Sequence, residues 1–409
     1  MVRASLTISD ADTAIWPILI DWGKGRGLRL DQLDQLITWT LRRQEPAVWQ
    51  WPAASLASIK VAIETRAALM QTFCAQLDAG EMSLPVPGMW TDWIALLWTL
   101  WLPLAQQIDQ KQRASNLQTR SQSHQRVFIQ GLLGGQGTGK TTLTKILTLI
   151  LGCLDQQAVS LSIDDLYLSY AKRCALKRED PRLIWRGPPG THDVRLGVQR
   201  LTEIRHCKAG QSVLLPQFDK ALHGGEGDRT SPLSVRSPTV VLFEGWFMGT
   251  QPLPHDVIAS PSFSFPFPIV TAEDRQFAQD CNRRLIDYLP LWALIDDLVV
   301  LQPQDYRFSL QWRQAAERKM IAQSQANEDA SGLANELVSG LASESAGKKS
   351  SEYARAKSGM SDAQVAEFVR YFWKALHPEL FITPLTTHKN TSLVVNLDAT
   401  HQLSNLRLP

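Results

Sequence analysis

The chain has 409 residues, enough for two domains or for one large domain with an appendage. Its formal net charge is +2 and its pI is near 8.2, so no nucleic-acid partner is expected and any anion binding should be local. The five cysteines are odd in number and form no CxxC pair, which indicates a reducing compartment and argues against a zinc site.

Residues 1–118 are predicted to form a separate, all-helical unit that holds nine of the 14 tryptophans. Its start has acidic residues and no apolar signal core, so no export or transit peptide is expected and a cytoplasmic location is predicted. The tryptophan stripe at 90–101 indicates a helix packed in a bundle or against the rest of the chain, with a membrane or partner surface as the alternative. The most hydrophobic run, 93–104, is too short to span a bilayer, so no membrane association is expected.

The second unit, residues 119–409, is expected to follow a polar stretch at about 106–125, which is predicted to be a linker or a solvated helix end. Strands are predicted at 127–133, 158–163, 213–215, 239–243, 298–301 and 392–397, and helices at 143–151, 194–207, 273–288 and 362–375. This alternation predicts an α/β fold, a P-loop NTPase with a doubly wound, mostly parallel sheet covered on both faces. Residues 322–352 have no aromatic side chain and are rich in Ala, Ser, Gly and Glu, which predicts a disordered low-complexity insertion.

Between the first strand and the first helix of this unit lies a glycine-rich turn that matches the Walker A pattern at every fixed position. The residues predicted to bind the nucleotide are Gly134, Gly135, Gln136, Gly137, Thr138, Gly139, Lys140, Thr141 and Thr142. Glycines let backbone N–H groups close around phosphate oxygens where a Cβ would collide. Lys140 is expected to reach the β- and γ-phosphates and the Thr141 hydroxyl to ligate magnesium, so the chain is predicted to bind a nucleoside triphosphate.

Carboxylates follow two of the predicted strands. Asp164 and Asp165 come where the strand at 158–163 ends, and ligands of doubly wound sheets sit beyond the carboxyl ends of strands. One of them can take the proton of an acceptor hydroxyl while the other orders magnesium or substrate, with a helix N-cap as the alternative. Glu244 directly follows the strand at 239–243, in the Walker B position, and is expected to coordinate magnesium; a strand-ending glutamate in a turn is the alternative.

Two loops rich in glycine and charge are candidates for an acceptor site. The residues predicted to contact the acceptor are Arg186, His192, Asp193, Asp219, Lys220, Asp228 and Arg229. Their mixture of charge and flexible backbone suits the capture of a small anion. A helix boundary capped by Asp193 and a solvated charged loop are the respective alternatives.

The sequence also narrows the class of phosphate chemistry. It contains neither the Asn-Lys-x-Asp guanine reader of a GTPase nor the Leu-Ser-Gly-Gly-Gln signature of an ABC ATPase. The remaining motifs indicate phosphoryl transfer to a small molecule. Arg307 and Arg313 are placed to reach the phosphoryl group from a helical lid, with surface arginines as the equal alternative.

Together, SIDDLY, RGPPGTHD, PQFDKALHGGEGDR, FEGWF and the helix around Trp312 and Arg313 resemble the P-loop glycerate kinases. These are the D-glycerate 3-kinase type of plants, fungi and cyanobacteria, within the phosphoribulokinase, uridine kinase and pantothenate kinase superfamily. The resemblance runs from Val127 to the C-terminus, and the helical N-terminal unit is similar to the cyanobacterial form. The insertion at 322–352 departs from the expected pattern.

The resemblance implies ATP-dependent, magnesium-dependent phosphorylation of a small anionic acceptor, D-glycerate, to 3-phosphoglycerate. In a photosynthetic organism this reaction closes glycolate salvage, or photorespiration. Matched by position, the catalytic aspartate of the superfamily falls on Asp164, with Asp165 beside it, and the magnesium-associated glutamate falls on Glu244. The loops at 186–193 and 215–229 fall where acceptor contacts lie.

Two other functions remain open from the sequence. A sister kinase would act on uridine, pantothenate or ribulose 5-phosphate, and Phe218 and Trp246 leave room for a stacking pocket. A nucleotide-dependent switch or scaffold would use the tryptophan-rich unit as its partner surface, because one fold hosts many functions.

Overall fold

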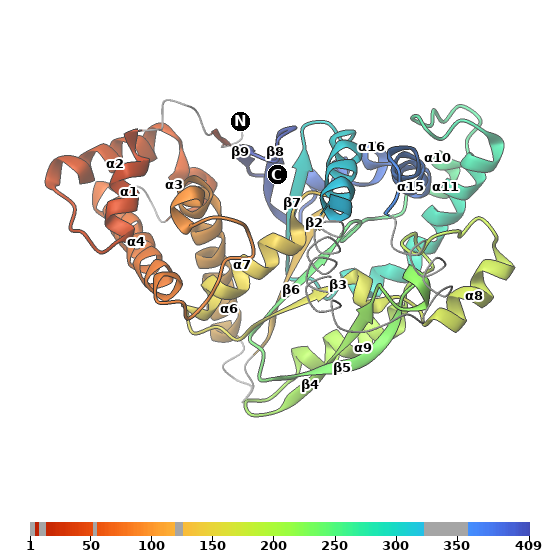
Figure 1. Cartoon of the computed structure of the whole chain (residues 1–409), viewed down its shortest axis with the longest axis horizontal. Coiled ribbons are helices and arrows are strands. Elements are labelled where there is room, and N and C mark those ends of the chain that lie inside the picture. Colours follow the sequence, from red (N-terminus) through yellow and green to blue (C-terminus); the bar gives the residue numbers. More distant parts are fainter. Residues whose placement is uncertain (1–4, 8–13, 52–54, 119–125, 323–358) are drawn as a thin grey trace, which may run out of the picture.

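A seven-stranded sheet forms the centre of the computed structural model, which describes residues 5–7, 14–51, 55–118, 126–322 and 359–409 (Figure 1). The strand order is β1-β9-β8-β7-β2-β6-β3. The strands from β8 to β3 run parallel, whereas the β8–β9 and β1–β9 pairs are antiparallel. Their bounds are β1 Ser5–Thr7, β2 Phe128–Gly134, β3 Ala158–Ser162, β6 Val240–Gly245, β7 Asp297–Pro303, β8 Thr391–Leu397 and β9 Leu403–Arg407. The predicted α/β class, a P-loop NTPase with a mostly parallel sheet, is confirmed.

The central strands β2 and β6 are buried along their whole length, as expected for apolar runs inside a parallel sheet. Side chains of β2 alternate between the two faces of the sheet, and each face has its own hydrophobic core. Leu132 packs in the core that contains α7 (Lys140–Gly152), and Ile129 packs in the core on the opposite face. The pairing of β2 with β6 places Leu132 beside Glu244. The carboxyl ends of β2, β6 and β3 therefore meet at one edge, where polar side chains gather.

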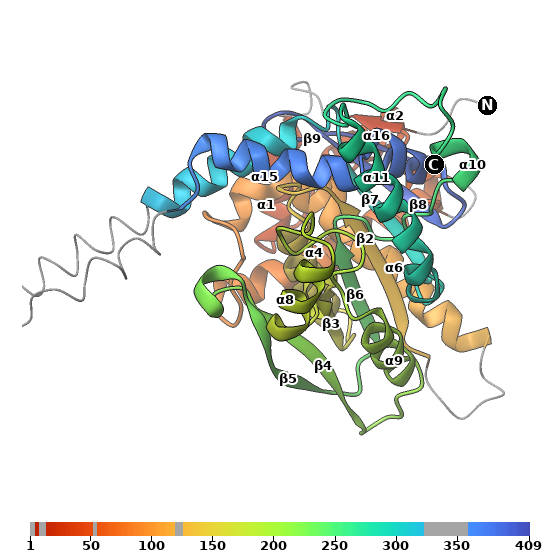
Figure 2. The same ribbon diagram turned by 90° about the vertical axis from the view of Figure 1, so that its right-hand side faces the viewer.

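Helices cover the face of the sheet opposite α7 (Figure 2). The longer ones are α9 Val194–Arg205, α11 Ala272–Arg284 and α15 Asp362–Ala375, with α8 Tyr170–Glu179 and the short α10 His255–Ile258, α12 Leu289–Trp292 and α16 Pro378–Phe381 around them. Side chains cap their first turns: Thr271 accepts the N–H of Asp274 in α11, and Ser361 accepts that of Gln364 in α15.

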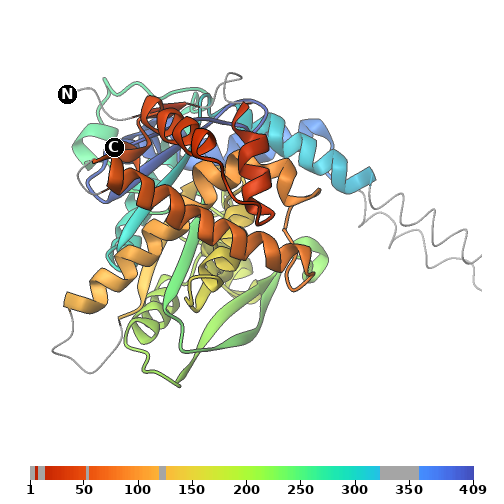
Figure 3. The same ribbon diagram turned by 90° about the vertical axis from the view of Figure 1, so that its left-hand side faces the viewer.

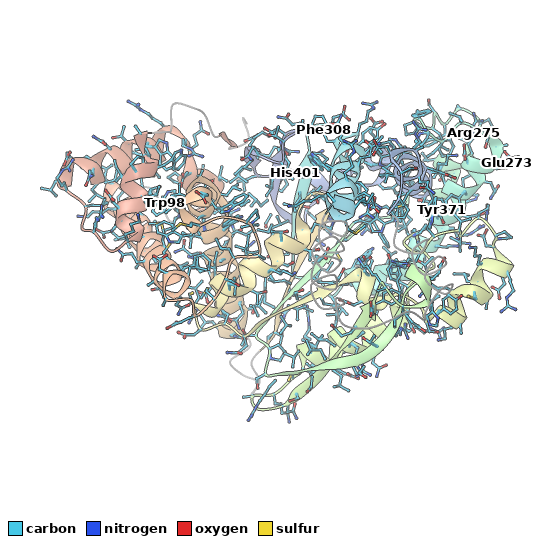
Figure 4. The ribbon with its side chains drawn as sticks, in the orientation of Figure 1. Trp98, Glu273, Arg275, Phe308, Tyr371 and His401 are labelled. Atoms are coloured by element: carbon cyan, nitrogen blue, oxygen red, sulfur yellow. The ribbon has the colours of Figure 1, made fainter. Side chains whose placement is uncertain are left out.

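The N-terminal helices share one apolar core with α7 and the adjoining face of the sheet (Figure 3). They are α1 Trp16–Gly23, α2 Leu30–Arg42, α3 Glu45–Val48, α4 Leu56–Asp78, α5 Ile94–Leu96 and α6 Leu102–Gln118. Trp98 lies among them (Figure 4), and both Trp98 and Trp101 are buried, so the tryptophan stripe packs inside the protein as predicted. Among the described residues, no helix combines the length and apolar character needed to cross a membrane.

The predicted strand at 213–215 does not join the parallel sheet, so this part of the sequence interpretation is wrong. β4, Ser212–Asp219, instead pairs with β5, Asp228–Arg236, as a separate antiparallel hairpin (Figure 2). Leu214 is exposed and Leu215 is buried, whereas a strand inside a parallel sheet is covered on both faces. The charged loop predicted at 215–229 is therefore mostly hairpin.

A helix at 308–322 follows β7 and lies beside α15 (Figure 2). Arg318 of this helix pairs with Asp362 of α15 at 2.9 Å. Beyond its first residue, the predicted low-complexity insertion at 322–352 lies outside the described residues.

Candidate active site

The Walker A turn, which connects β2 to α7, depends on glycines in the left-handed backbone region. Gly137 and Gly139 have φ values of 78° and 81°, which residues with a Cβ rarely adopt. A Cβ on Gly137 would lie 2.8 Å from the Cβ of Trp312. Thr138 closes the turn by donating its hydroxyl to the carbonyl of Gly135 at 2.9 Å. The predicted nucleotide-binding residues, 134–142, thus run from the last residue of β2 through this turn into the first helical turn of α7.

Lys140 is the first residue of α7 and reaches back over the turn. Its Nζ donates to the carbonyl of Gly135 at 2.8 Å. Burial lowers the pKa of Lys140, and the charges of Glu244 and Asp164 oppose that shift. An ammonium held by one neutral carbonyl can exchange that contact for phosphate oxygens, which bind it more strongly.

The two residues predicted to hold magnesium are brought together. The hydroxyl of Thr141 donates to Oε1 of Glu244 at 2.9 Å, although the two lie 103 residues apart in the chain. A hydroxyl and a carboxylate are hard oxygen donors, and magnesium usually completes such a pair with water and substrate phosphates. In the described part of the chain, no cluster of three or more Asp, Glu, His or Cys forms a metal cage. The donor set therefore fits a magnesium ion bound jointly with a nucleotide.

Asp164 lies in a short 3-10 turn, Ile163–Leu166, directly after β3. Its carboxylate accepts a hydrogen bond from Nζ of Lys220 at 2.6 Å and another from the hydroxyl of Tyr167. Burial raises the pKa of Asp164, but the charge and hydrogen bond of Lys220, together with the smaller effects of Tyr167 and His192, outweigh burial, so the pKa is lowered overall. Asp164 is therefore ionised at neutral pH, with the Lys140 ammonium nearby.

Asp165 has different surroundings from Asp164. Its Oδ2 accepts the backbone N–H of Ser162 at 3.0 Å, and its side chain lines a groove with Lys145 and Thr148 of α7. Burial raises the pKa of Asp165 to about 6. The structure thus separates the two predicted catalytic carboxylates: Asp164 meets Lys220, and Asp165 secures the backbone of its own turn.

Four of the predicted acceptor residues are held by partners within the protein. Asp193 caps α9 by accepting the N–H of its third residue at 3.1 Å, and it pairs with Arg229 at 2.9 Å. Asp228 accepts the N–H of the first residue of α8 at 2.9 Å. Asp219 accepts a backbone N–H in the hairpin turn at 2.8 Å. These contacts fix the hairpin against α8 and α9.

Two arginines near the hairpin have no carboxylate partner within hydrogen-bonding distance among the described residues. Arg186 and Arg173 donate to the carbonyl of Glu226 at 3.0 Å and 2.6 Å. Their guanidinium groups lie 5.7 Å and 5.1 Å from the ring centre of Phe218. Arg186 was predicted; Arg173 was missed because α8, the helix that carries it, was not predicted. The charges of these two arginines act on one another, and the pair suits a small carboxylate.

His192 is buried among aromatic rings. Its ring stacks on that of Tyr167 with centroids 4.6 Å apart, and its Nδ1 lies 2.8 Å from the hydroxyl of Tyr288. Burial lowers the pKa of His192 to about 3, although the charge of Asp164 opposes that shift. The imidazole is therefore neutral at neutral pH.

His401, which the sequence gave no reason to select, contacts the Walker A turn from the loop between β8 and β9. Its Nε2 lies 2.7 Å from the carbonyl oxygen of Gly137, and its ring stacks on Trp312 with centroids 4.0 Å apart. Figure 4 shows His401 near Phe308, at the start of the helix that carries Trp312. The turn is thus covered on its outer side by the C-terminal part of the chain.

The two predicted lid arginines each have an acidic neighbour, Arg307 with Asp305 at 3.1 Å and Arg313 with Glu317 at 3.0 Å. Arg307 also lines a cavity of about 350 Å³ beside the Walker A turn, whose other charged residues are Asp305 and Glu379. One positive and two negative charges disfavour a small anion in this cavity. The arginine pair near the hairpin offers the better site for a carboxylate.

Comparisons with known proteins bear on this site. A scan of the chain against protein families finds no match. The chain is 29% identical over 338 residues to the chloroplastic D-glycerate 3-kinase of Arabidopsis thaliana, a match that covers 80% of this chain and 63% of the plant protein. It is also 29% identical over 255 residues to the uncharacterized kinase mug58 of Schizosaccharomyces pombe, covering 60% of this chain and 79% of the yeast protein. This chain thus spans about three fifths of the length of the Arabidopsis relative.

A solved structure agrees with these relatives. The D-glycerate 3-kinase from Cryptococcus neoformans aligns at 25% identity with a TM-score of 0.57, covering 75% of this chain and 99% of that one. The resemblance to P-loop D-glycerate 3-kinases that the motifs predicted is therefore confirmed.

Proposed function

We propose that the chain is an ATP-dependent kinase that phosphorylates D-glycerate to 3-phosphoglycerate. The observation that carries the proposal is the meeting of the Walker A turn, the Thr141–Glu244 pair and the ionised Asp164 at one edge of the sheet. A phosphate cradle, a magnesium donor pair and a candidate base are the parts that phosphoryl transfer needs. The names of the Arabidopsis and Cryptococcus proteins support D-glycerate as the acceptor.

In this proposal the backbone N–H groups of the turn and Lys140 hold the triphosphate of ATP. Thr141 and Glu244 would hold Mg²⁺, which would neutralise part of the negative charge of the transferring phosphate. The primary hydroxyl of the acceptor meets Asp164, which takes its proton as the new O–P bond forms. The bond from the γ-phosphorus to the bridging oxygen breaks, and ADP leaves. Alignment and charge neutralisation supply most of the acceleration because the transition state is loose.

The pair of Arg173 and Arg186 is proposed to hold the carboxylate of the acceptor, with Lys220 turning toward it from Asp164. Two guanidinium groups bound only to backbone carbonyls can take a carboxylate in charge-assisted hydrogen bonds. Asp193, Asp219, Asp228 and Arg229 then act by fixing the hairpin that carries Lys220, and Asp165 acts by fixing the turn that carries Asp164. His192 is proposed to lie behind the acceptor.

We further propose that the protein acts in the cytoplasm and, in a photosynthetic organism, in glycolate salvage. The scattered cysteines, which form no CxxC pair, support the first part. The Arabidopsis relative is chloroplastic by name, so an organelle is the competing location. Fractionation of source cells with an antibody to the chain decides between the two.

A sister kinase for a nucleoside is the second candidate. The aromatic walls of the 350 Å³ cavity, which include Trp246, Phe372 and Trp373, suit a flat ring better than a three-carbon acid. A switch that binds ATP without an acceptor is the third candidate. It predicts slow hydrolysis that D-glycerate does not stimulate.

The deciding experiment measures ADP release from magnesium-ATP with D-glycerate, L-glycerate, uridine, pantothenate and ribulose 5-phosphate, with Asp164→Asn alongside. We expect turnover with D-glycerate only, and its loss in Asp164→Asn. Turnover with a different acceptor supports the assignment as a kinase but contradicts D-glycerate as its substrate. Absence of any acceptor dependence favours the switch.

A further inference from the structure

The hydroxyl of Tyr288 has a complete set of hydrogen bonds, which defines where its proton points. The oxygen accepts the backbone N–H of Gly190 at 3.0 Å, and it lies 2.8 Å from Nδ1 of His192. Burial raises the pKa of Tyr288, so the phenol keeps its proton. Nδ1 is the acceptor that the described residues offer this O–H, so the proton is donated to Nδ1.

This donation fixes the tautomer of His192. A neutral imidazole has one nitrogen that accepts and one that carries hydrogen, so acceptance at Nδ1 places the hydrogen on Nε2. Nε2 is buried and has no hydrogen-bond partner in the described part of the chain. A buried N–H without an acceptor costs stability, and native proteins rarely keep one without a use.

The imidazole of His192 is linked to the proposed base through Tyr167. His192 forms a β-bridge with Tyr167 and stacks on its ring at an interplanar angle of 21°. The hydroxyl of Tyr167 in turn bonds to the carboxylate of Asp164, and Asp164 acts on His192 through its charge. The imidazole thus packs against the tyrosine that bonds to the carboxylate of Asp164, which an acceptor hydroxyl must approach.

We propose that Tyr288 is a positioning residue for the acceptor site, because it holds His192 as the Nε2–H tautomer and so keeps this N–H available to an oxygen of the acceptor bound at Asp164. The inference rests on the proposed kinase function for the identity of the acceptor. The assignment of the tautomer does not depend on it. Tyr288 makes no contact with the acceptor in this arrangement and acts through His192.

The tautomer is tested without substrate. Two-bond ¹H–¹⁵N correlation spectra of the full chain with ¹⁵N-labelled histidine distinguish Nε2–H from Nδ1–H rings by their nitrogen shifts, and His192→Gln assigns the signal. We expect His192 to be neutral and protonated at Nε2 at pH 7. A ring protonated at Nδ1, or at both nitrogens, overturns the proposal.

Kinetics then test the role of Tyr288. Tyr288→Phe removes the O–H with little change of shape, and we expect the KM for the acceptor to rise roughly tenfold, the scale of one lost hydrogen bond, with the KM for ATP unchanged. The Nε2–H signal of His192 should weaken in the same variant. Tyr371→Phe is the matched control, since Tyr371 is also buried and donates at 3.4 Å to the carbonyl of Trp185. An equal rise of the KM for ATP and of the KM for the acceptor, or no rise of either KM, contradicts the proposal.

A pair of substitutions at His192 keeps the test valid if Tyr288→Phe fails to fold. The amide nitrogen of Gln lies near the position of Nε2 and retains the donor, whereas the amide of Asn matches Nδ1 and loses it. We expect His192→Gln to keep the acceptor KM within about threefold of wild type and His192→Asn to raise it roughly tenfold. A higher acceptor KM in His192→Gln than in His192→Asn contradicts the proposal. If wild type turns over a different acceptor of the panel, the proposed function fails and the same comparison is made with that acceptor.

Discussion

The ammonium of Lys220 lies 2.6 Å from Oδ2 of Asp164, which joins the tip of the hairpin to the edge of the central sheet. Lys220 is the main influence that lowers the pKa of Asp164 against burial. The lysine therefore favours the ionised form of the proposed base. Because its side chain is largely exposed, it can also turn toward an incoming carboxylate.

The first prediction concerns this pair. In Lys220→Met, burial acts on Asp164 without opposition from that charge, so its pKa should rise. The base must be ionised to accept a proton, so the acid limb of the kcat/KM profile with D-glycerate should move to higher pH by about 1 unit or more. Lys220→Arg keeps the charge, so the acid limb of its kcat/KM profile should lie near the pH found for wild type. A Met variant with an unshifted acid limb contradicts this role.

The second prediction concerns magnesium. Thr141→Val removes the hydroxyl that faces Glu244 without changing the shape of the side chain, so we expect the magnesium concentration for half-maximal turnover to rise about 10- to 100-fold. Thr141→Ser retains the hydroxyl and should behave nearly as wild type. Thr148→Val is a control on the same helix, where the hydroxyl donates to the carbonyl of Thr144. An unchanged magnesium requirement in Thr141→Val argues against a metal at this position.

Parts of the site could be predicted from the sequence because their chemistry is local or because adjacent parallel strands end at one edge. The Walker A turn is local: its glycines and the lysine after them define both backbone and ligand. The meeting of Thr141 with Glu244 follows from the neighbouring strands β2 and β6. Asp164 follows a third parallel strand, β3, and lies close to Lys140 for the same reason.

The contacts that depend on tertiary packing could not be predicted. Asp164 and Lys220 lie 56 residues apart and His192 and Tyr288 lie 96 apart, and no pattern of periodicity links such positions. The strand at 213–215 was assigned to the parallel sheet although it belongs to a hairpin. A short apolar run of this kind occurs both in a two-stranded hairpin and in a buried parallel strand, so the sequence pattern does not distinguish them. β1 and β9 have 3 and 5 residues, too few to show alternation, and β1 pairs with β9 from the opposite end of the chain.

The third prediction concerns stability against pH. The folded-state pKa of Asp165, about 6, lies above its ordinary value of 3.8, so the folded protein binds this proton more tightly than the unfolded chain. The resulting stabilisation is complete below pH 4 and is lost as the pH rises through 6. Asp165→Asn keeps an acceptor for the Ser162 N–H and should be more stable than wild type above pH 6, by up to about 3 kcal/mol, but not at pH 4.

Urea unfolding at pH 4, 5, 6 and 7 measures this difference. Asp219→Asn changes an exposed carboxylate that accepts a single backbone N–H, and it should keep the pH dependence of wild type. If the difference in unfolding free energy between Asp165→Asn and wild type is the same from pH 4 to pH 7, titration of Asp165 is not its cause.

The fourth prediction concerns the backbone of the Walker A turn. Gly137→Ala places a methyl group 2.8 Å from the Cβ of Trp312, at a φ of 78° that costs an L-residue roughly 1–2 kcal/mol. The turn and the His401 contact must shift, so we expect the thermal stabilisation of the protein by magnesium-ATP to be largely lost. Gly152→Ala is the control, because Gly152 ends α7 with open space around it and alanine favours the helix by about 1 kcal/mol. That variant should be slightly more stable than wild type and respond to ATP normally. If Gly137→Ala binds ATP as wild type does, the turn is not the phosphate cradle.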